Sequence, residues 1–181
     1  MHNAAADFDG SPYPYLTGDG EWLRMLDRLC DQPRELIDRI EEIRVWREAL
    51  PRPPGGFPVT HGDMNAGNAM WDGQRIRLID FEEPIYTWNA ADMARPFRET
   101  QGMSVSHRKT CFEAFMSGYK MHRAPQFHDP LDYSNFITMK NLEMYGWGLK
   151  EWKGDKSFDG RDMDVALAEL KDVILRPLMI G

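Results

Sequence analysis

The sequence predicts an α+β fold that is mainly helical and contains one short β-hairpin. Apolar residues recur at helical spacing before residue 50 and again after residue 105. Between these regions, "AMWDGQRIRLIDF" places two strand-like runs around an Asp-Gly pair. The 181 residues suffice for one domain with a substantial core. We expect residues 21–181 to form that domain and residues 1–20, rich in Gly, Pro and Asp, to form an irregular arm or hinge-like segment.

Two helices are expected between residues 21 and 50. Their apolar positions are Trp22, Leu26 and Leu29 in the first, and Leu36, Ile40, Ile43 and Leu50 in the second. We interpret residues 18–20 as a turn before the first helix. The Pro-rich residues 51–58 are expected to end the pair.

Three further helices are expected within residues 106–122, 130–152 and 157–178. Their inner faces are predicted to contain Cys111, Phe112, Phe115 and Tyr119, then Phe136, Met139, Leu142 and Gly146, then Val165, Leu167, Leu170 and Ile174. These Met-rich and aromatic stripes are typical of core packing rather than of a cofactor site.

The hairpin is predicted to turn at Asp72 and Gly73, because glycine readily supplies the positive φ of a two-residue turn. Strand alternation then places Ile76, Leu78 and Asp80 on one face. A carboxylate beside an apolar face is costly unless it is hydrogen-bonded or binds a cation. Asp80 is therefore either a functional residue or a strand-end residue that caps a turn.

Composition and charge exclude several classes of function. A net charge of −7 argues against a nucleic-acid surface, and no apolar run is long enough to cross a membrane. The cysteines, Cys30 and Cys111, form no metal motif, and we see no secretory signal. We therefore expect a cytoplasmic protein with no nucleic-acid or membrane partner.

The stretch "HGDMNAGN", followed a dozen residues later by "IDFE", contains residues suited to one kind of chemistry. Asp63, on a loop, can accept a proton from a substrate hydroxyl as a general base. Asn68 and Asp80 offer oxygen ligands of the kind that Mg²⁺ prefers. A metal held by only two protein groups keeps positions for phosphate oxygens, so the set suits phosphoryl transfer.

The pattern "HGDMNAGN", "IDFE" and "DMA" resembles the aminoglycoside phosphotransferase and choline kinase family, small-molecule relatives of protein kinases. The resemblance extends from about Glu21 to the C-terminus. It implies a kinase-like C-terminal lobe with a catalytic set of Asp63, as base, and His61, which braces the loop. It also implies Mg²⁺ ligands at Asn68 and Asp80, and structural support of the site by Asp92.

The resemblance further implies ATP and Mg²⁺ as cofactors and a small molecule as substrate. Asn65 stands where the family has a residue near the transferred phosphate, although Met64-Asn65-Ala66 departs from the usual Leu-His-Pro. Together with Glu82 and Glu83, Asn65 is a candidate for contact with substrate or phosphate.

Kinases of this kind begin with a β-rich lobe that covers the phosphates and supplies a strand lysine. The first lysine here is Lys109, and no β-rich region precedes His61. We therefore expect the N-terminal β-lobe to be absent. The C-terminal lobe is then expected to work with a protein that supplies an N-lobe or as a homo-oligomer.

Three functional hypotheses follow. The chain is a phosphotransferase whose missing half comes from another polypeptide or whose ATP is held in another way. It is instead a catalytically silent, kinase-like binding module. In the third hypothesis, the same carboxylates and metal serve a different reaction, because folds are reused for unrelated chemistry.

Overall fold

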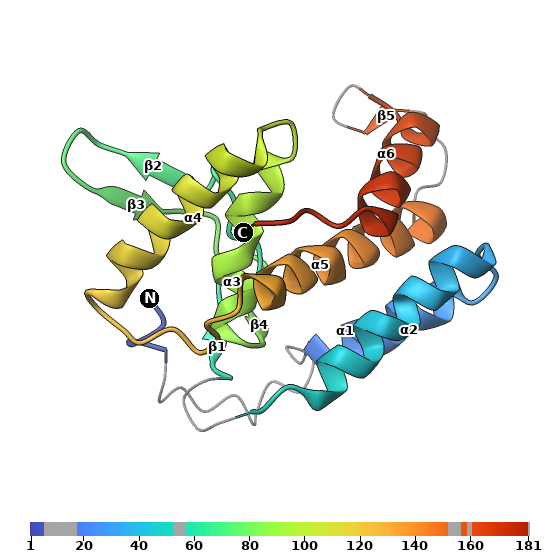
Figure 1. Cartoon of the computed structure of the whole chain (residues 1–181), viewed down its shortest axis with the longest axis horizontal. Coiled ribbons are helices and arrows are strands. Elements are labelled where there is room, and N and C mark those ends of the chain that lie inside the picture. The colour runs from blue at the N-terminus through green and yellow to red at the C-terminus, as the bar shows by residue number, and fades with distance from the viewer. Residues whose placement is uncertain (6–17, 53–56, 152–156, 159–160, 181) are drawn as a thin grey trace. The chain divides into compact units, whose positions relative to one another are not determined.

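The computed structural model describes residues 1–5, 18–52, 57–151, 157–158 and 161–180. It divides into two compact units, which are considered separately. The first contains Met1–Gly18, Arg52–Ile137 and Met179–Gly181, and the second contains Asp19–Pro51 and Thr138–Leu178. Helices dominate both, and the strands of the described residues form short antiparallel pairs (Figure 1). The predicted fold class, α+β and mainly helical with a short hairpin, is confirmed.

The second unit is mainly helical. It contains most of α1 (Gly18–Leu29), α2 (Arg34–Ala49), the later part of α5 (Pro130–Glu151) and α6 (Met163–Leu175), with the short pair β5 (Ser157–Phe158) and β6 (Arg161–Asp162). Two glycines let helices approach α5 closely. A Cβ on Gly146 would lie 3.3 Å from Met25, and one on Gly148 would lie 2.8 Å from Leu167.

Two details of the predicted helices are wrong. Residues 18–20 belong to α1 rather than to a turn, because burial of Trp22, Met25 and Leu29 outweighs the low helix propensity of glycine. Val165 is 53% exposed, since α6 buries Met163 and Val173 together with the predicted Ile174. Most of the predicted arm, residues 6–17, lies outside the described residues.

The first unit contains the polar motif. Its elements are β1 (Val59–Thr60), β2 (Ala69–Trp71), β3 (Ile76–Leu78), β4 (Ile85–Tyr86), α3 (Asn89–Ala94), η2 (Arg95–Thr100), α4 (Val105–Lys120) and the start of α5. β1 pairs with β4, and β2 pairs with β3. Ring contacts join these helices, with centroids 5.9 Å apart for Trp88 and Phe136 and 4.9 Å apart for Phe112 and Tyr133.

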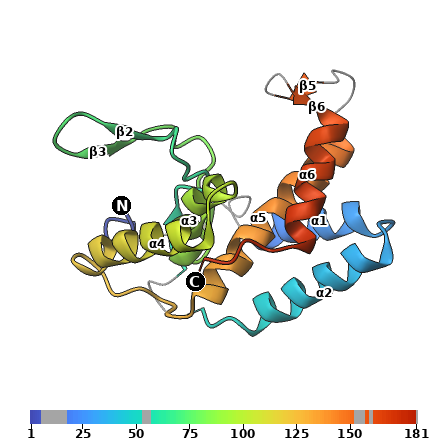
Figure 2. The ribbon, with the colours of Figure 1, turned by 45° about the horizontal axis from the view of Figure 1, so that its top comes forward.

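The β2–β3 hairpin forms as predicted, but its turn is longer. Trp71 pairs with Ile76, so the connection is residues 72–75. The Asp72 carboxylate accepts hydrogen bonds from the backbone N–H groups of Gln74 and Arg75, at 3.0 and 2.9 Å, which favours the longer loop. Figure 2 shows the hairpin projecting from the rest of its unit. No helix of the described residues is long and apolar enough to cross a bilayer.

Candidate active site

The polar loop, residues 61–68, is attached to α3 through Asp92. The two carboxylate oxygens of Asp92 accept hydrogen bonds from the backbone N–H groups of His61, at 2.7 Å, and Gly62, at 3.1 Å. Asp92 is buried, and it lies in the first turn of α3, where a helix favours negative charge. The loop therefore starts from a fixed backbone position.

Asp92 remains ionised despite its burial. Desolvation of the carboxyl raises its pKa, but the hydrogen bonds from His2 and from the His61 backbone, with the charge of Arg95, outweigh that effect. The net pKa of Asp92 is lowered. A charged acceptor makes stronger hydrogen bonds than a neutral one, so the anchor is strongest in the ionised state.

Gly62 is required by the backbone path. Its φ is +83°, a conformation that glycine adopts readily and other residues do not. A Cβ built there would lie 1.5 Å from the carbonyl oxygen of Glu83. The glycine of the His-Gly-Asp motif thus lets the segment before β4 pass directly against the loop.

The His61 ring connects the loop to the end of the hairpin. Its Nε2 donates to the carbonyl oxygen of Ile79 at 2.8 Å, and its Nδ1 accepts the backbone N–H of Asp63 at 3.4 Å. The ring also lies 4.4 Å, centroid to centroid, from Phe81. His61 is fully buried. Its contacts are those of a brace, while its membership of a catalytic set remains a prediction.

Asp63 forms a small network with two asparagines. Its Oδ2 accepts from the side-chain amide of Asn65 at 3.0 Å and from that of Asn68 at 3.3 Å. Asn65 also accepts the backbone N–H of Asn68, at 3.1 Å. Among the described residues, none donates to the other carboxylate oxygen of Asp63, which therefore stays available to a substrate hydroxyl.

Asp80 lies beside this network. β3 ends at Leu78, and the backbone N–H of Ile79 donates to the carbonyl oxygen of Asn68 at 3.1 Å. Asp80 therefore follows a residue that is bonded to Asn68, and it precedes Phe81, which contacts His61. Backbone contacts thus place Asp80 one residue from a bond to Asn68, which is itself bonded to Asp63.

Asp80 has an unusual backbone conformation. Its φ is +63°, and it is the only non-glycine residue with positive φ among those described. Strand alternation therefore stops before Asp80, and its predicted place on the face of Ile76 and Leu78 is wrong. Aspartate and asparagine adopt a left-handed backbone more readily than other residues with a Cβ, so this position suits Asp better than most side chains.

The other candidate residues have clear positions but no assigned ligand. Asn65 braces the loop, while Glu82 and Glu83 are exposed and make no side-chain hydrogen bond to a described residue. Sequence reasoning missed Glu99, whose carboxylate accepts the backbone N–H of Ala66 at 3.0 Å. It also missed His2, which contacts Asp92. Neither has a local motif, because the partners lie 33 and 90 positions away.

The donor set fits a divalent cation that is shared with phosphate. Asn68 uses its amide nitrogen on Asp63, which leaves its oxygen available, and no described residue hydrogen-bonds the exposed Asp80 carboxylate. The described chain contains no group of three or more His, Cys, Asp or Glu side chains that could hold a metal. Two oxygen ligands are nevertheless enough for Mg²⁺ when phosphate oxygens complete its coordination.

Comparisons with known proteins found a matching family model and a similar solved structure. The family model described as "Phosphotransferase enzyme family" matches residues 1–133. The structure of amicoumacin kinase hAmiN in complex with AMP-PNP, Ca²⁺ and Ami is similar, with a TM-score of 0.72 and 16% sequence identity. That match covers 97% of this chain and 55% of the kinase, so the chain spans about half of its length. Among curated proteins, no sequence matches the chain.

Proposed function

Because the chain belongs to the phosphotransferase enzyme family, we propose that it transfers a phosphoryl group from ATP to a hydroxyl of a small molecule. The observation that carries this proposal is the shared neighbourhood of Asp63, Asn68 and Asp80 beside a loop held by Asp92. A general base and two oxygen ligands for a cation are the parts that phosphoryl transfer requires.

In this proposal the side chains have distinct tasks. Asp63 accepts the proton of the acceptor hydroxyl on the carboxylate oxygen that the asparagines leave open. Asn65 and Asn68 orient the carboxylate from its other oxygen. His61 fixes the distance between the loop and the residue before Asp80. Positioning of this kind supplies much of the rate in phosphoryl transfer, since little covalent chemistry falls to the protein.

Asn68 and Asp80 are the residues that would hold Mg²⁺. The ion, when bound, neutralises charge on the phosphate oxygens of ATP. The fit rests on the available Asn68 oxygen and on the exposed Asp80 carboxylate. The amicoumacin kinase structure, whose fold is similar, contains AMP-PNP and Ca²⁺. We extend the use of a nucleotide and a divalent ion to this chain as part of the proposal.

The hairpin supports a proposal about partners. Trp71 and Ile76, which pair across the hairpin, are 65 and 61% exposed, although neighbouring large apolar side chains usually avoid water. We propose that a nucleotide-binding lobe on another polypeptide, or a second copy of the chain, covers them in the working protein.

A silent binding module is the alternative function, and one observation favours it. Asp63, Asn65 and Asn68 already satisfy one another by hydrogen bonds, so the loop holds its shape without metal or nucleotide. A silent module has no need of the exposed Asp80 carboxylate, to which no described residue donates a hydrogen bond. It also has no need of a general base with an open oxygen or of two oxygen ligands for a cation, which is the reason for preferring the catalytic proposal.

Calorimetry with AMP-PNP and Mg²⁺ tests the proposal. The natural chain should bind the nucleotide only when Mg²⁺ is present, and Asp80→Asn should weaken that binding about tenfold or more. Asparagine tolerates the left-handed backbone, so this variant removes charge with little added strain. Glu113→Gln, an exposed carboxylate on α4, is the matched control and should bind normally.

Two results would count against the proposal. Equal affinity in Asp80→Asn and the natural chain would remove Asp80 from the metal site. Absence of binding heat for the natural chain would exclude nucleotide binding by this chain alone and would assign that binding to the covering lobe proposed above. In a transfer assay with a reactive acceptor, Asp63→Asn should lower the rate by about a hundredfold or more. An unchanged rate would remove Asp63 as the general base, whereas the absence of any transfer by the natural chain would favour the silent module.

A further inference from the structure

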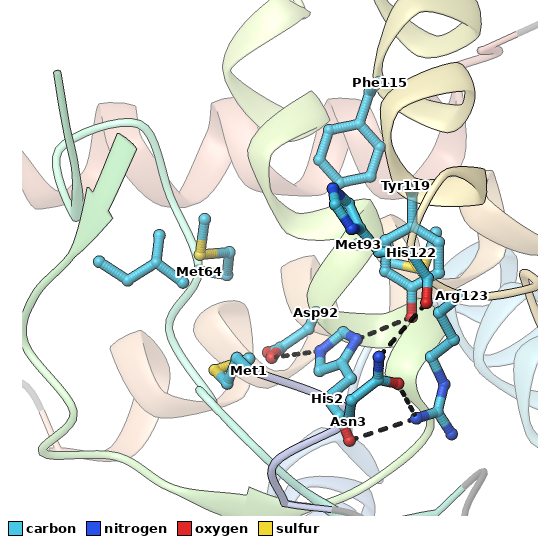
Figure 3. Close-up of a pocket in the computed structure, with 11 residues that line it drawn as sticks. Met1, His2, Asn3, Met64, Asp92, Met93, Phe115, Tyr119, His122 and Arg123 are labelled. Atoms are coloured by element: carbon cyan, nitrogen blue, oxygen red, sulfur yellow. Dashed lines mark hydrogen bonds and ion pairs between the residues drawn. The ribbon is translucent and has the colours of Figure 1, made fainter. Parts of the chain in front are cut away.

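His2 lies between α3 and α4, at the wall of a cavity of about 310 Å³ (Figure 3). Its Nε2 is 3.3 Å from the Oδ2 of Asp92, and its Nδ1 is 2.9 Å from the hydroxyl oxygen of Tyr119. The side chain is 9% exposed. The imidazole therefore bridges α3, which holds the polar loop through Asp92, and α4, which carries Tyr119. Among the described residues, no other hydrogen bond connects α4 to Asp92.

The partners of His2 define its hydrogen-bond roles. An ionised carboxylate only accepts, so Nε2 carries the proton that is donated to Asp92. In the neutral ring Nδ1 then accepts the hydroxyl proton of Tyr119. Burial raises the pKa of the Tyr119 phenol, the charge of Arg123 lowers it, and the charge of Asp92 raises it. The net pKa is raised, so the phenol keeps its proton. A neutral imidazole thus satisfies both neighbours.

Other charged groups surround the bridge. Arg123, just after α4, donates to the backbone carbonyl of His2 at 3.3 Å and to the side chain of Asn3 at 2.7 Å. The His122 ring lines the same cavity. Arg95, just after α3, acts electrostatically on Asp92. The Arg123 hydrogen bond holds the His2 backbone, and the contacts with Asp92 and Tyr119 set the direction of the ring from both sides.

We propose that His2 is a positioning residue for the polar loop, acting through Asp92. The Oδ2 atom that accepts from His2 is the atom that accepts the backbone N–H of His61. By fixing the rotation of the carboxylate, His2 also holds Oδ1 against the N–H of Gly62. The chain of contacts runs from Tyr119 through His2 and Asp92 to the residue before Asp63. The catalytic meaning of this role rests on the proposed function.

Amide hydrogen exchange measures the role without requiring activity. In His2→Leu, which removes both hydrogen bonds, the amides of His61 and Gly62 should exchange about tenfold faster. His2→Gln keeps a donor and an acceptor on one side chain and should restore most of the protection. The amide of Leu50, which donates to Arg47 in the other unit, is the internal control and should not change.

The test depends on comparing the amide exchange rates of His61 and Gly62 in His2→Gln with those in His2→Leu. Unchanged exchange in His2→Leu, or equal loss in both variants, would overturn the proposal, because simple packing does not distinguish them in this way. If the leucine variant does not fold, Tyr119→Phe takes its place. Removal of the hydroxyl should speed exchange at His61 and Gly62 by severalfold, and no effect there would contradict the bridge.

Nitrogen NMR of the imidazole adds a spectroscopic test. The bridge requires a proton on Nε2, and a neutral ring protonated on Nδ1 instead would contradict it. Where transfer is measurable, His2→Leu should lower kcat about tenfold with little change in the KM for ATP. Altered exchange without any phosphoryl transfer would support the positioning role and refute the proposed function.

Discussion

The polar loop and the β2–β3 hairpin are adjacent in sequence but differ in how they are held. The loop is buried at both ends and half-buried or exposed between them, and its backbone is hydrogen-bonded to Asp92, Glu99 and its own asparagines. The hairpin exposes Trp71 and Ile76, and its side-chain hydrogen bonds and ion pairs lie around Asp72. A rigid loop thus adjoins an arm with an uncovered apolar surface.

This difference indicates that the structure of the loop is fixed by contacts within the chain, whereas the hairpin surface needs a partner to cover it. Contacts within the first unit fix the loop, so the general base can be positioned before any ligand arrives. The hairpin has no such cover among the described residues. Asp80 lies at the junction, since Ile79 is bonded to the loop while β3 belongs to the hairpin. The following predictions compare the two regions.

Gly62→Ala should produce the largest effect. The new Cβ would meet the Glu83 carbonyl oxygen, and the left-handed backbone adds strain, so we expect a loss of about 3 kcal/mol or more in unfolding free energy. Gly73→Ala, in the hairpin turn, has positive φ but no atom within 4 Å, and should lose only about 1 kcal/mol. Chemical denaturation measures both, and equal losses would refute the close approach.

Asp92→Asn should rank second, with a loss of about 2 kcal/mol at neutral pH, because the side-chain amide places a donor against a backbone N–H. The pKa of Asp92 is lowered in the folded chain, so its stabilisation is present above the ordinary carboxyl pKa. That stabilisation is lost as the pH falls toward the lowered value. The difference between the natural chain and Asp92→Asn should therefore shrink on acidification.

Asp38→Asn is the control for this pH series. Asp38 forms an exposed ion pair with Arg34, at 2.8 Å, and its replacement should change the unfolding free energy by less than about 1 kcal/mol. A stability difference for Asp92→Asn that stays constant across the acid range would show that its carboxylate is not the anchor.

Asp80 is the site of the third prediction, which concerns backbone strain. Asp80→Gly and Asp80→Ala both remove the carboxylate, but only glycine accepts the left-handed backbone freely. We expect the glycine variant to be more stable than the alanine variant by about 1 kcal/mol in thermal unfolding. Equal stability would mean that the strain at Asp80 is absent in solution.

The smallest effect on stability is expected in the hairpin. Trp71→Ser combined with Ile76→Ser should change the unfolding free energy by no more than about 0.5 kcal/mol per site, because both side chains are largely exposed. Self-association in sedimentation should nevertheless decrease. Met121→Ser, at an 80% exposed residue after α4, controls for general loss of apolar surface. Strong destabilisation by the hairpin pair would show that the described chain already buries it.

Local pattern predicted much of this molecule. Apolar spacing located α1, α2, α4, α5 and α6 but not the short α3 and η2. The motif from His61 to Asp80 located the polar cluster, because its members are held by near-neighbour contacts. The longer turn was not predicted, because it is stabilised by hydrogen bonds from backbone N–H groups to the Asp72 side chain. The left-handed Asp80 and the remote partners His2 and Glu99 were not predicted either. Those features depend on long-range packing, which has no periodic signal.

Paramagnetic broadening by Mn²⁺, with AMP-PNP present, tests the central claim most directly, because Mn²⁺ prefers the same oxygen ligands as Mg²⁺. The account predicts that the NMR signals of Asp63, Asn68 and Asp80 broaden first and together, and that Asp80→Asn abolishes the effect. Broadening spread over unrelated surface carboxylates, or centred away from these three residues, would contradict it.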